Sequence, residues 1–224
     1  GAAILAHRLL DTENEVTAAA PATTALDARA KPDASPVPPS ATSVEPAAFA
    51  ALQAAASEIE ASIDLRAAVS SENCSTAQGR AASLAMLSAA ETSAERLHQL
   101  VVQSVGLLRE SAHDAKLDAR RHDELRLDVA AATGRTLMLA DRLRDIRLQA
   151  ISTARSLIAF MEENAGGFEV RDGFVSFARQ GAQDQFNHFQ VNTSRVLAQE
   201  LQARNETADA LVEQQALLAR AQAN

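Results

Sequence analysis

An apolar stripe whose members are alternately four and three residues apart runs through the middle of the sequence. From Leu97 to Phe160 it advances by about 3.5 residues per helical turn, the period of a heptad repeat. A heptad repeat kept over many turns indicates a left-handed coiled coil, because the apolar side chains then stay on one side of the helix. The stripe predicts one continuous helix over residues 80–163, and its span from Leu84 to Phe160 would be about 115 Å. Its members are Leu84, Leu87, Ala94, Leu97, Val101, Ser104, Leu108, Ser111, Ala115, Asp118, His122, Leu125, Val129, Ala132, Thr136, Leu139, Leu143, Ile146, Ala150, Thr153, Leu157 and Phe160.

The composition favours packed helices over a large globular core. Hydrophobic residues make up 47% of the 224 residues, but alanine dominates this group, and Trp and Tyr are absent. Large cores normally rely on big aromatic side chains, whereas alanine is a strong helix former that buries little area. We therefore expect an all-α protein, built as an elongated antiparallel coiled-coil or helical bundle.

Residues 164–177 interrupt the helices and predict a small β-hairpin. The glycine-rich run NAGG is typical of a helix C-terminus, and Asp172-Gly173 is a strong signal for a two-residue hairpin turn. Pairing over residues 168–177 places Phe168 opposite Phe177. A short connection makes consecutive helices antiparallel neighbours. We therefore expect a last helix over residues 182–221 that runs antiparallel to the helix predicted over residues 80–163, with the hairpin at the tip.

The N-terminal part predicts a short amphipathic helix over residues 1–20 and a disordered Pro/Ala-rich linker over 21–46. All six prolines lie in that linker, and proline removes backbone donors and fixes φ. The linker could be a flexible tether or a docking motif for a proline-binding module. The remaining domain, 47–224, is expected to begin with a helix over 47–69 that packs back on the long helix, followed by a turn over 70–79. Because the chain begins with Gly, we expect a fragment or a processed product.

The charge of the chain argues against nucleic acid as its main partner. The net charge is −8, and an acidic surface repels phosphate groups. Membrane contact is expected only through the tip or through a segment preceding the N-terminus, because no apolar run approaches the ~18 residues of a spanning helix. The single cysteine excludes an internal disulfide and leaves the compartment open between the cytoplasm and a bacterial extracytoplasmic or secreted location.

Few residues suggest catalysis or metal binding. Glu95–His98 and Glu110–His113 both match E-x-x-H, but they lie fifteen residues apart on one predicted helix and cannot share a metal. Cys74 has no adjacent Lys or Arg that would lower its pKa. We therefore expect no enzyme activity and no cofactor or metal; a metal-binding bundle would need Glu and His clusters on separate helices.

Asp118 and His122 are the most unusual members of the stripe. Polar residues in a coiled-coil core can fix register, and an imidazole beside a carboxylate can act as a pH switch. The alternative is that the packing opens locally, as the small residues Ser104, Ser111 and Ala115 suggest, and that both groups are hydrated.

The phenylalanines are concentrated at one end of the predicted hairpin of helices. Six of the seven lie between positions 160 and 189, whereas the rest of the chain uses Ala and Leu. The rings could close the tip as a small local core, or they could form a contact surface, with Phe174 pointing away from that core beside Arg171. The candidate contact residues are Phe168, Phe174, Phe177, Phe186 and Phe189.

These features predict a non-enzymatic coiled-coil scaffold, spacer or assembly subunit that makes protein–protein contacts through its Phe-rich tip. A protein partner or self-association as a homo-oligomer is expected. The alternative is a bacterial secretion-apparatus subunit of the tip or translocator kind, or the extracytoplasmic sensory region of a membrane receptor. That alternative is an analogy at the level of the fold and depends on no motif.

Overall fold

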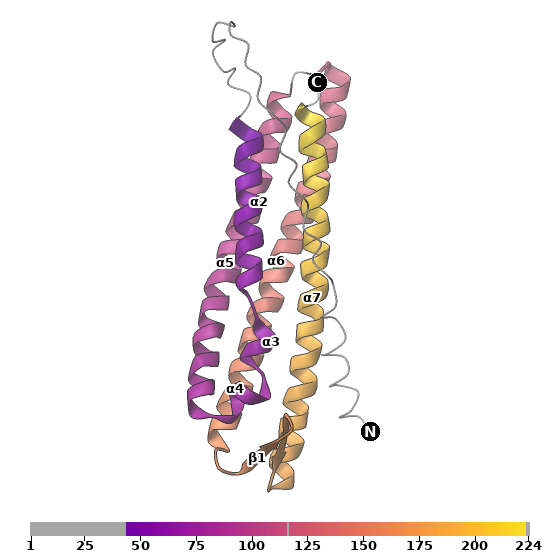
Figure 1. Cartoon of the computed structure of the whole chain (residues 1–224). Helices are drawn as coiled ribbons and strands as arrows, with labels where there is room; N and C mark the ends of the chain where they lie inside the picture. Colours follow the sequence, from indigo (N-terminus) through magenta and orange to yellow (C-terminus); the bar gives the residue numbers. More distant parts are fainter. Residues whose placement is uncertain (1–43, 116, 223–224) are drawn as a thin grey trace, which may run out of the picture. The chain divides into compact units, whose positions relative to one another are not determined.

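The computed structural model describes residues 44–115 and 117–222, and these form a bundle of long helices with one β-hairpin (Figure 1). The all-α fold class predicted from the sequence is confirmed for this part of the chain. The expected helix over residues 1–20 and most of the expected linker lie outside the described residues. In chain order the elements are α2 (Val44–Ser62), α3 (Leu65–Ala68), α4 (Ser71–Ser75), α5 (Ala77–Asp114), α6 (Ala119–Glu163), β1 (Phe168–Arg171), β2 (Phe174–Phe177) and α7 (Gln180–Gln222).

The prediction of one continuous helix over residues 80–163 is wrong, because the chain reverses after Asp114. Helix α5 ends there, Ala115 is extended, and the Asp118 carboxylate caps α6 by accepting a hydrogen bond from the Arg121 amide at 3.0 Å. The two halves of the stripe then face each other as antiparallel neighbours. His98 Nε2 lies 2.8 Å from Asp141 Oδ1, a contact between residues 43 positions apart in the chain.

Helices α6 and α7 are antiparallel, as expected for helices joined by a short hairpin, and they make the most extensive helix–helix contact. A ladder of ion pairs follows their interface at heptad spacing on both helices, which is the arrangement that fixes register in coiled coils. The pairs are Asp128 with Arg220 at 3.0 Å, Arg135 with Glu213 at 3.4 Å, and Arg142 with Glu206 at 2.7 Å.

The segment before α5 is more broken than the expected helix 47–69 and turn 70–79. Helix α2 already begins at Val44, so the last three residues of the predicted linker are helical; Pro46 is tolerated because amides in the first turn have no intrahelical acceptor. Polar side chains at Asp64, Ser70 and Thr76 then cap α3, α4 and α5 in turn. The expected packing of this segment against the long helix is confirmed, since α2 packs mainly against α5.

The β-hairpin has the predicted position and register. Phe168 pairs with Phe177 and Val170 with Val175, in an antiparallel ladder. Asp172 and Gly173 both have positive φ, 51° and 79°, as a tight two-residue turn requires. Figure 1 shows the hairpin at the opposite end of the bundle from the end of α7.

The apolar core is divided into a large cluster at the hairpin end, a second cluster at the α5–α6 turn, and a small cluster between them. The middle cluster contains only Ile59, Leu97, Leu143 and Ala203 as buried members. The middle cluster is therefore the smallest of the three. The hairpin-end cluster includes Leu65, Cys74, Leu87, Ile151, Leu157, Ile158, Phe160, Met161, Phe186 and Val196.

Candidate functional site

The Phe-rich tip is a packed core. The Phe177 ring lies 5.3 Å from the rings of Phe168 and Phe186 and 5.5 Å from that of Phe160, which in turn lies 5.4 Å from Phe189. Centroid distances in this range are those of aromatic rings in mutual contact. These five rings therefore form a local core, which is the first of the two alternatives predicted for the tip.

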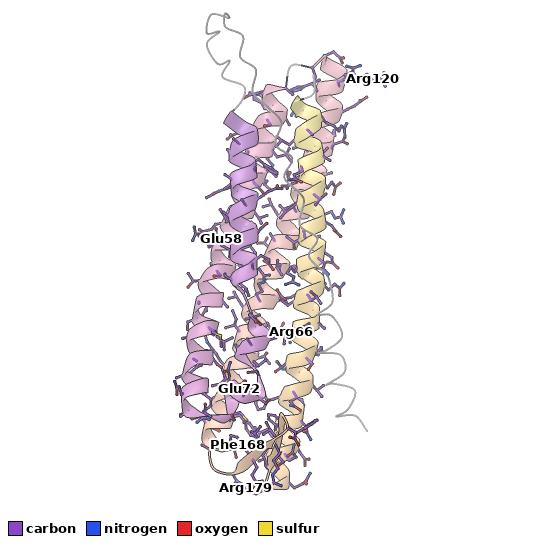
Figure 2. All side chains as sticks on the ribbon, viewed as in Figure 1. Glu58, Arg66, Glu72, Arg120, Phe168 and Arg179 are labelled. Atoms are coloured by element: carbon purple, nitrogen blue, oxygen red, sulfur yellow. The ribbon has the colours of Figure 1, made fainter. Side chains whose placement is uncertain are left out.

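Phe174 is the member of the predicted contact set that stays exposed. Its side chain is 52% exposed, and Val170 on the neighbouring strand is 37% exposed. Phe168, Phe177 and Phe189 are partly buried in the cluster, and Phe186 is buried. A contact role for the tip stays a prediction, and the exposed hairpin face is the part of the tip that could serve it (Phe168 is labelled in Figure 2).

The expectation that Asp118 and His122 occupy consecutive core positions is wrong. Both lie at the α5–α6 turn, where Asp118 is exposed and caps α6. His122 is partly exposed, and its Nε2 lies 3.2 Å from the carbonyl oxygen of His113. The register and pH-switch roles required burial between helices, and the chain reversal removes that environment.

A pocket of about 290 Å³ lies between α2 and the three long helices, midway along the bundle. Its wall is mainly apolar, with Leu97, Val101, Leu143 and Leu211 supplying the larger side chains. Each helix also contributes one alanine to the lining, and their short side chains leave the space that larger residues would fill. These alanines are Ala56 of α2, Ala94 of α5, Ala140 of α6 and Ala208 of α7.

A buried arginine, Arg147 of α6, stands at this pocket. Its side chain is 1% exposed and joins three helices: Nε donates to Glu200 Oε1 of α7 at 2.8 Å, and Nη2 donates to Glu60 Oε1 of α2. The third nitrogen, Nη1, is buried and has no hydrogen-bond partner. A buried donor without an acceptor is destabilising, and because Nη1 is covered in this structure, an oxygen of a bound molecule reaches it only when a neighbouring side chain moves.

The charged side chains that line the pocket are mostly basic, but their charges are paired. Arg144, Arg147 and Arg204 line it together with one carboxylate, that of Glu60, while Asp145 and Glu200 pair with Arg144 and Arg147 from outside the lining. Arg204 Nε lies 3.7 Å from Glu60 Oε1, so this carboxylate is shared between two guanidinium groups. The charges of these groups balance while Glu60 is in place, and its movement away from the pocket would leave one positive charge in excess.

Hydrogen bonds between polar side chains also link α2 to α7 at the pocket. Gln215 Nε2 of α7 donates to Gln53 Oε1 of α2, and both residues line the pocket. Helix α2 also meets α6 and α7 through two buried apolar side chains, Phe49 and Ile59. The amide pair and Glu60 are the polar contacts across the pocket that a ligand could replace.

Of the E-x-x-H residues, His98 is paired with Asp141; Cys74 is buried. Burial raises the pKa of the Cys74 thiol to about 11, although the nearby charge of Arg80 acts in the opposite direction. Within residues 44–115 and 117–222, no group of three or more His, Cys, Asp and Glu side chains could hold a metal ion.

Comparison with known proteins gives no family for this chain. No family model matches it, and neither the curated proteins nor the solved structures include a significant match. Among the described helices, none combines the length and the hydropathy needed to cross a membrane.

Proposed function

We propose that this chain is a non-enzymatic binding module whose helical bundle holds a small molecule in the pocket between α2 and the long helices. The observation that carries the proposal is the unpartnered Nη1 of Arg147, a fully buried charged side chain at the pocket. Buried polar atoms are almost always hydrogen-bonded in folded proteins. Of the five exceptions among the described side chains, this one alone belongs to a residue that lines the pocket, which supports a binding site there.

This proposal is closer to the sensory function that the sequence predicts as an alternative than to the scaffold function. A sensory bundle needs a ligand pocket and an element that responds to it. The pocket provides the first, and α2, attached across the pocket through Glu60 and Gln53, can provide the second. Binding that favours one arrangement of α2 would shift the population of that arrangement.

Ligand-dependent melting, followed by circular dichroism, tests the proposal. A ligand that binds only the folded chain raises the melting temperature, by an amount that grows with its concentration. A panel of short-chain acids, alcohols and amines should contain at least one compound that raises it. The pocket-filling variant Ala56→Leu should lose that response, and Ala130→Leu, at an exposed position of α6 outside the pocket, should keep it.

No stabilisation by any member of the panel would contradict the proposal. So would equal stabilisation of the wild type and Ala56→Leu, because the compound would then bind elsewhere.

The scaffold function predicted from the sequence is the second candidate, favoured by exposed apolar side chains on α6. Leu127 is 72% exposed and Met138 is 61% exposed. They are eleven residues apart, which is about three helical turns, so they lie on one side of α6. We propose that a second copy of the chain covers this side. Sedimentation equilibrium should show a dimer that Leu127→Glu converts to a monomer; a monomeric wild type would exclude it.

A further inference from the structure

We propose that the ligand of the pocket is a single-chain carboxylate of about ten non-hydrogen atoms, whose head group pairs with Arg147. The inference rests on the proposed function and adds the chemical class of the molecule that binds. Three properties of the pocket support it: the unpartnered guanidinium nitrogen, the positive charge that remains when Glu60 moves away, and the size and polarity of the wall.

The head group is assigned from the hydrogen bonds of Arg147. A guanidinium group holds its donors in a fixed plane and pairs best with carboxylate or phosphate oxygens. Nε and Nη2 are already used by Glu200 and Glu60, whereas Nη1 has no acceptor. The remaining donor therefore calls for one oxygen of a planar anionic group.

The charge of the site selects an anion over a cation once Glu60 has moved away. Arg147 and Arg204 then face a single remaining carboxylate, that of Glu200, so one positive charge is in excess. A cationic ligand would have to share this space with the guanidinium groups of Arg147 and Arg204. Like charges in a partly desolvated site are strongly disfavoured.

The tail is assigned from the wall and the volume. Leu97, Val101, Leu143 and Leu211 offer apolar contacts, and together with the alanines they leave about 290 Å³. This volume corresponds to about ten water molecules at the density of the liquid, and octanoate has about ten non-hydrogen atoms. A second charged group would have to be buried against this apolar wall, which is why a monocarboxylate fits better than a dicarboxylate.

Glu60 competes with the ligand for Arg147. The side chains of Arg147, Arg204, Glu60 and Glu200 form a group with equal numbers of positive and negative charges. Adding a carboxylate leaves one negative charge in excess unless an existing carboxylate moves away. Glu60 is the one that can move, because its side chain is 26% exposed, whereas that of Glu200 is 11% exposed.

Calorimetric titration of the full chain with octanoate, octanol and octylammonium tests the inference. Octanoate should bind at least about tenfold more tightly than octanol, the factor that one hydrogen bond to a charged group is worth. Octylammonium should bind more weakly than both. Octanol binding as tightly as octanoate would overturn the carboxylate assignment while leaving a ligand pocket, and no binding by any of the three would remove the proposed function itself.

A tryptophan reporter locates the binding, since the chain contains no other Trp or Tyr. Val212 lines the pocket and is 64% exposed, and Val191 is 70% exposed on the same helix outside the pocket. Octanoate should change the emission of Val212→Trp with the calorimetric affinity and leave Val191→Trp unchanged. Equal responses at both positions would show non-specific binding and overturn the site.

The variant Glu60→Gln tests whether the carboxylate of Glu60 competes with the ligand for Arg147. Removing its charge should strengthen octanoate binding by about tenfold, because the ligand no longer displaces an ion pair. Glu58→Gln is the matched control, since Glu58 is on the same helix, exposed and outside the pocket (labelled in Figure 2). Arg204→Gln should weaken binding. Equal affinities for Glu60→Gln and Glu58→Gln, with both variants folded by circular dichroism, would contradict the competition.

Discussion

The hairpin end and the middle of the bundle are crossed by the same two helices, α6 and α7, yet they are packed in opposite ways. At the hairpin end, Phe160 of α6 and Phe186 of α7 are both buried within a cluster of aromatic rings. In the middle, Arg147 and Glu200 meet as a buried ion pair beside a pocket, and the apolar cluster is small.

Under the proposed function, this difference separates stability from binding within one fold. Buried aromatic rings contribute large apolar area without unsatisfied polar atoms. A buried ion pair adds little net stability, because removing the charges from water offsets their attraction. The hairpin end therefore contributes more to the stability of the bundle, and the middle contains the pocket in which we propose that a ligand binds.

The largest expected effect is the loss of a ring at the hairpin end. Phe186→Ala should lower the free energy of unfolding by about 3–5 kcal/mol, because it removes a buried side chain and leaves a cavity. Phe174→Ala is the control: its ring is 52% exposed, and the loss should stay below about 1 kcal/mol. Urea unfolding followed by circular dichroism measures both, and equal losses would mean that the tip is not a closed core.

Breaking the ion pair in the middle should have the next largest effect. Arg147→Met removes the partner of a nearly buried carboxylate, Glu200, and should cost about 3 kcal/mol. Adding Glu200→Gln should restore at least half of the loss, because no unpaired charge then remains. Arg142→Met, at an arginine that is 48% exposed, should cost less than about 0.5 kcal/mol. A double variant no more stable than Arg147→Met would refute this explanation.

The thiol of Cys74 reports on how tightly the hairpin end is closed. Burial raises its pKa from 9.0 to about 11, so the thiolate fraction at pH 8 should be about 100-fold lower than in the unfolded chain. Alkylation with iodoacetamide should be slow in the folded chain, fast in denaturant and unaffected by octanoate. Rapid alkylation of the folded chain at pH 8 would show that this end opens readily.

The raised pKa of the Cys74 thiol also makes the free energy of unfolding depend on pH. The folded state holds the proton more tightly than the unfolded state, so the contribution of the neutral thiol is fully present below pH 9.0. It is lost as pH rises from 9.0 towards 11. The variant Cys74→Ala should therefore show a flatter decline of stability over this range.

The ion-pair ladder on the outside of the α6–α7 interface should show the smallest effect. Arg135 and Glu213 are 59% and 50% exposed, and Glu213→Ala should lower the free energy of unfolding by less than about 0.5 kcal/mol. Salt should reduce this effect further. A loss as large as that of Arg147→Met would remove the distinction between exposed and buried pairs.

The hairpin end is the region that the sequence predicts best, because its signals are local. Asp172-Gly173 specifies the turn, alternation fixes the pairing of Phe168 with Phe177, and the concentration of phenylalanines indicates a cluster. Each of these follows from residues a few positions apart. The sequence does not decide whether the phenylalanine rings form a core or a contact surface, because that depends on the positions of α6 and α7.

The periodicity of the sequence does not reveal the chain reversal after Asp114, because the two halves of the stripe are in phase. Ser111, Asp118 and Leu125 continue the heptad spacing across the break, so periodicity alone indicates one helix. The available signal was Asp118, a favoured N-cap residue next to a run of small and polar residues.

The pocket could not be predicted, since its residues come from four helices. Arg147 lies beside the stripe, and its charge predicts a solvent-exposed position. Its burial depends on the register of α7, which brings Glu200 to it, and on the return of α2, which brings Glu60. The alanines that leave the space are also ordinary helix formers, so they carry no separate signal.

Side-chain NMR of the arginine guanidinium groups tests most directly the claim that Arg147 is a buried donor awaiting a carboxylate. The account predicts a resolved, slowly exchanging Arg147 signal that shifts on addition of octanoate and not of octanol, while the signal of Arg142 stays unchanged. A rapidly exchanging Arg147 signal, or one that octanoate does not move, would contradict it.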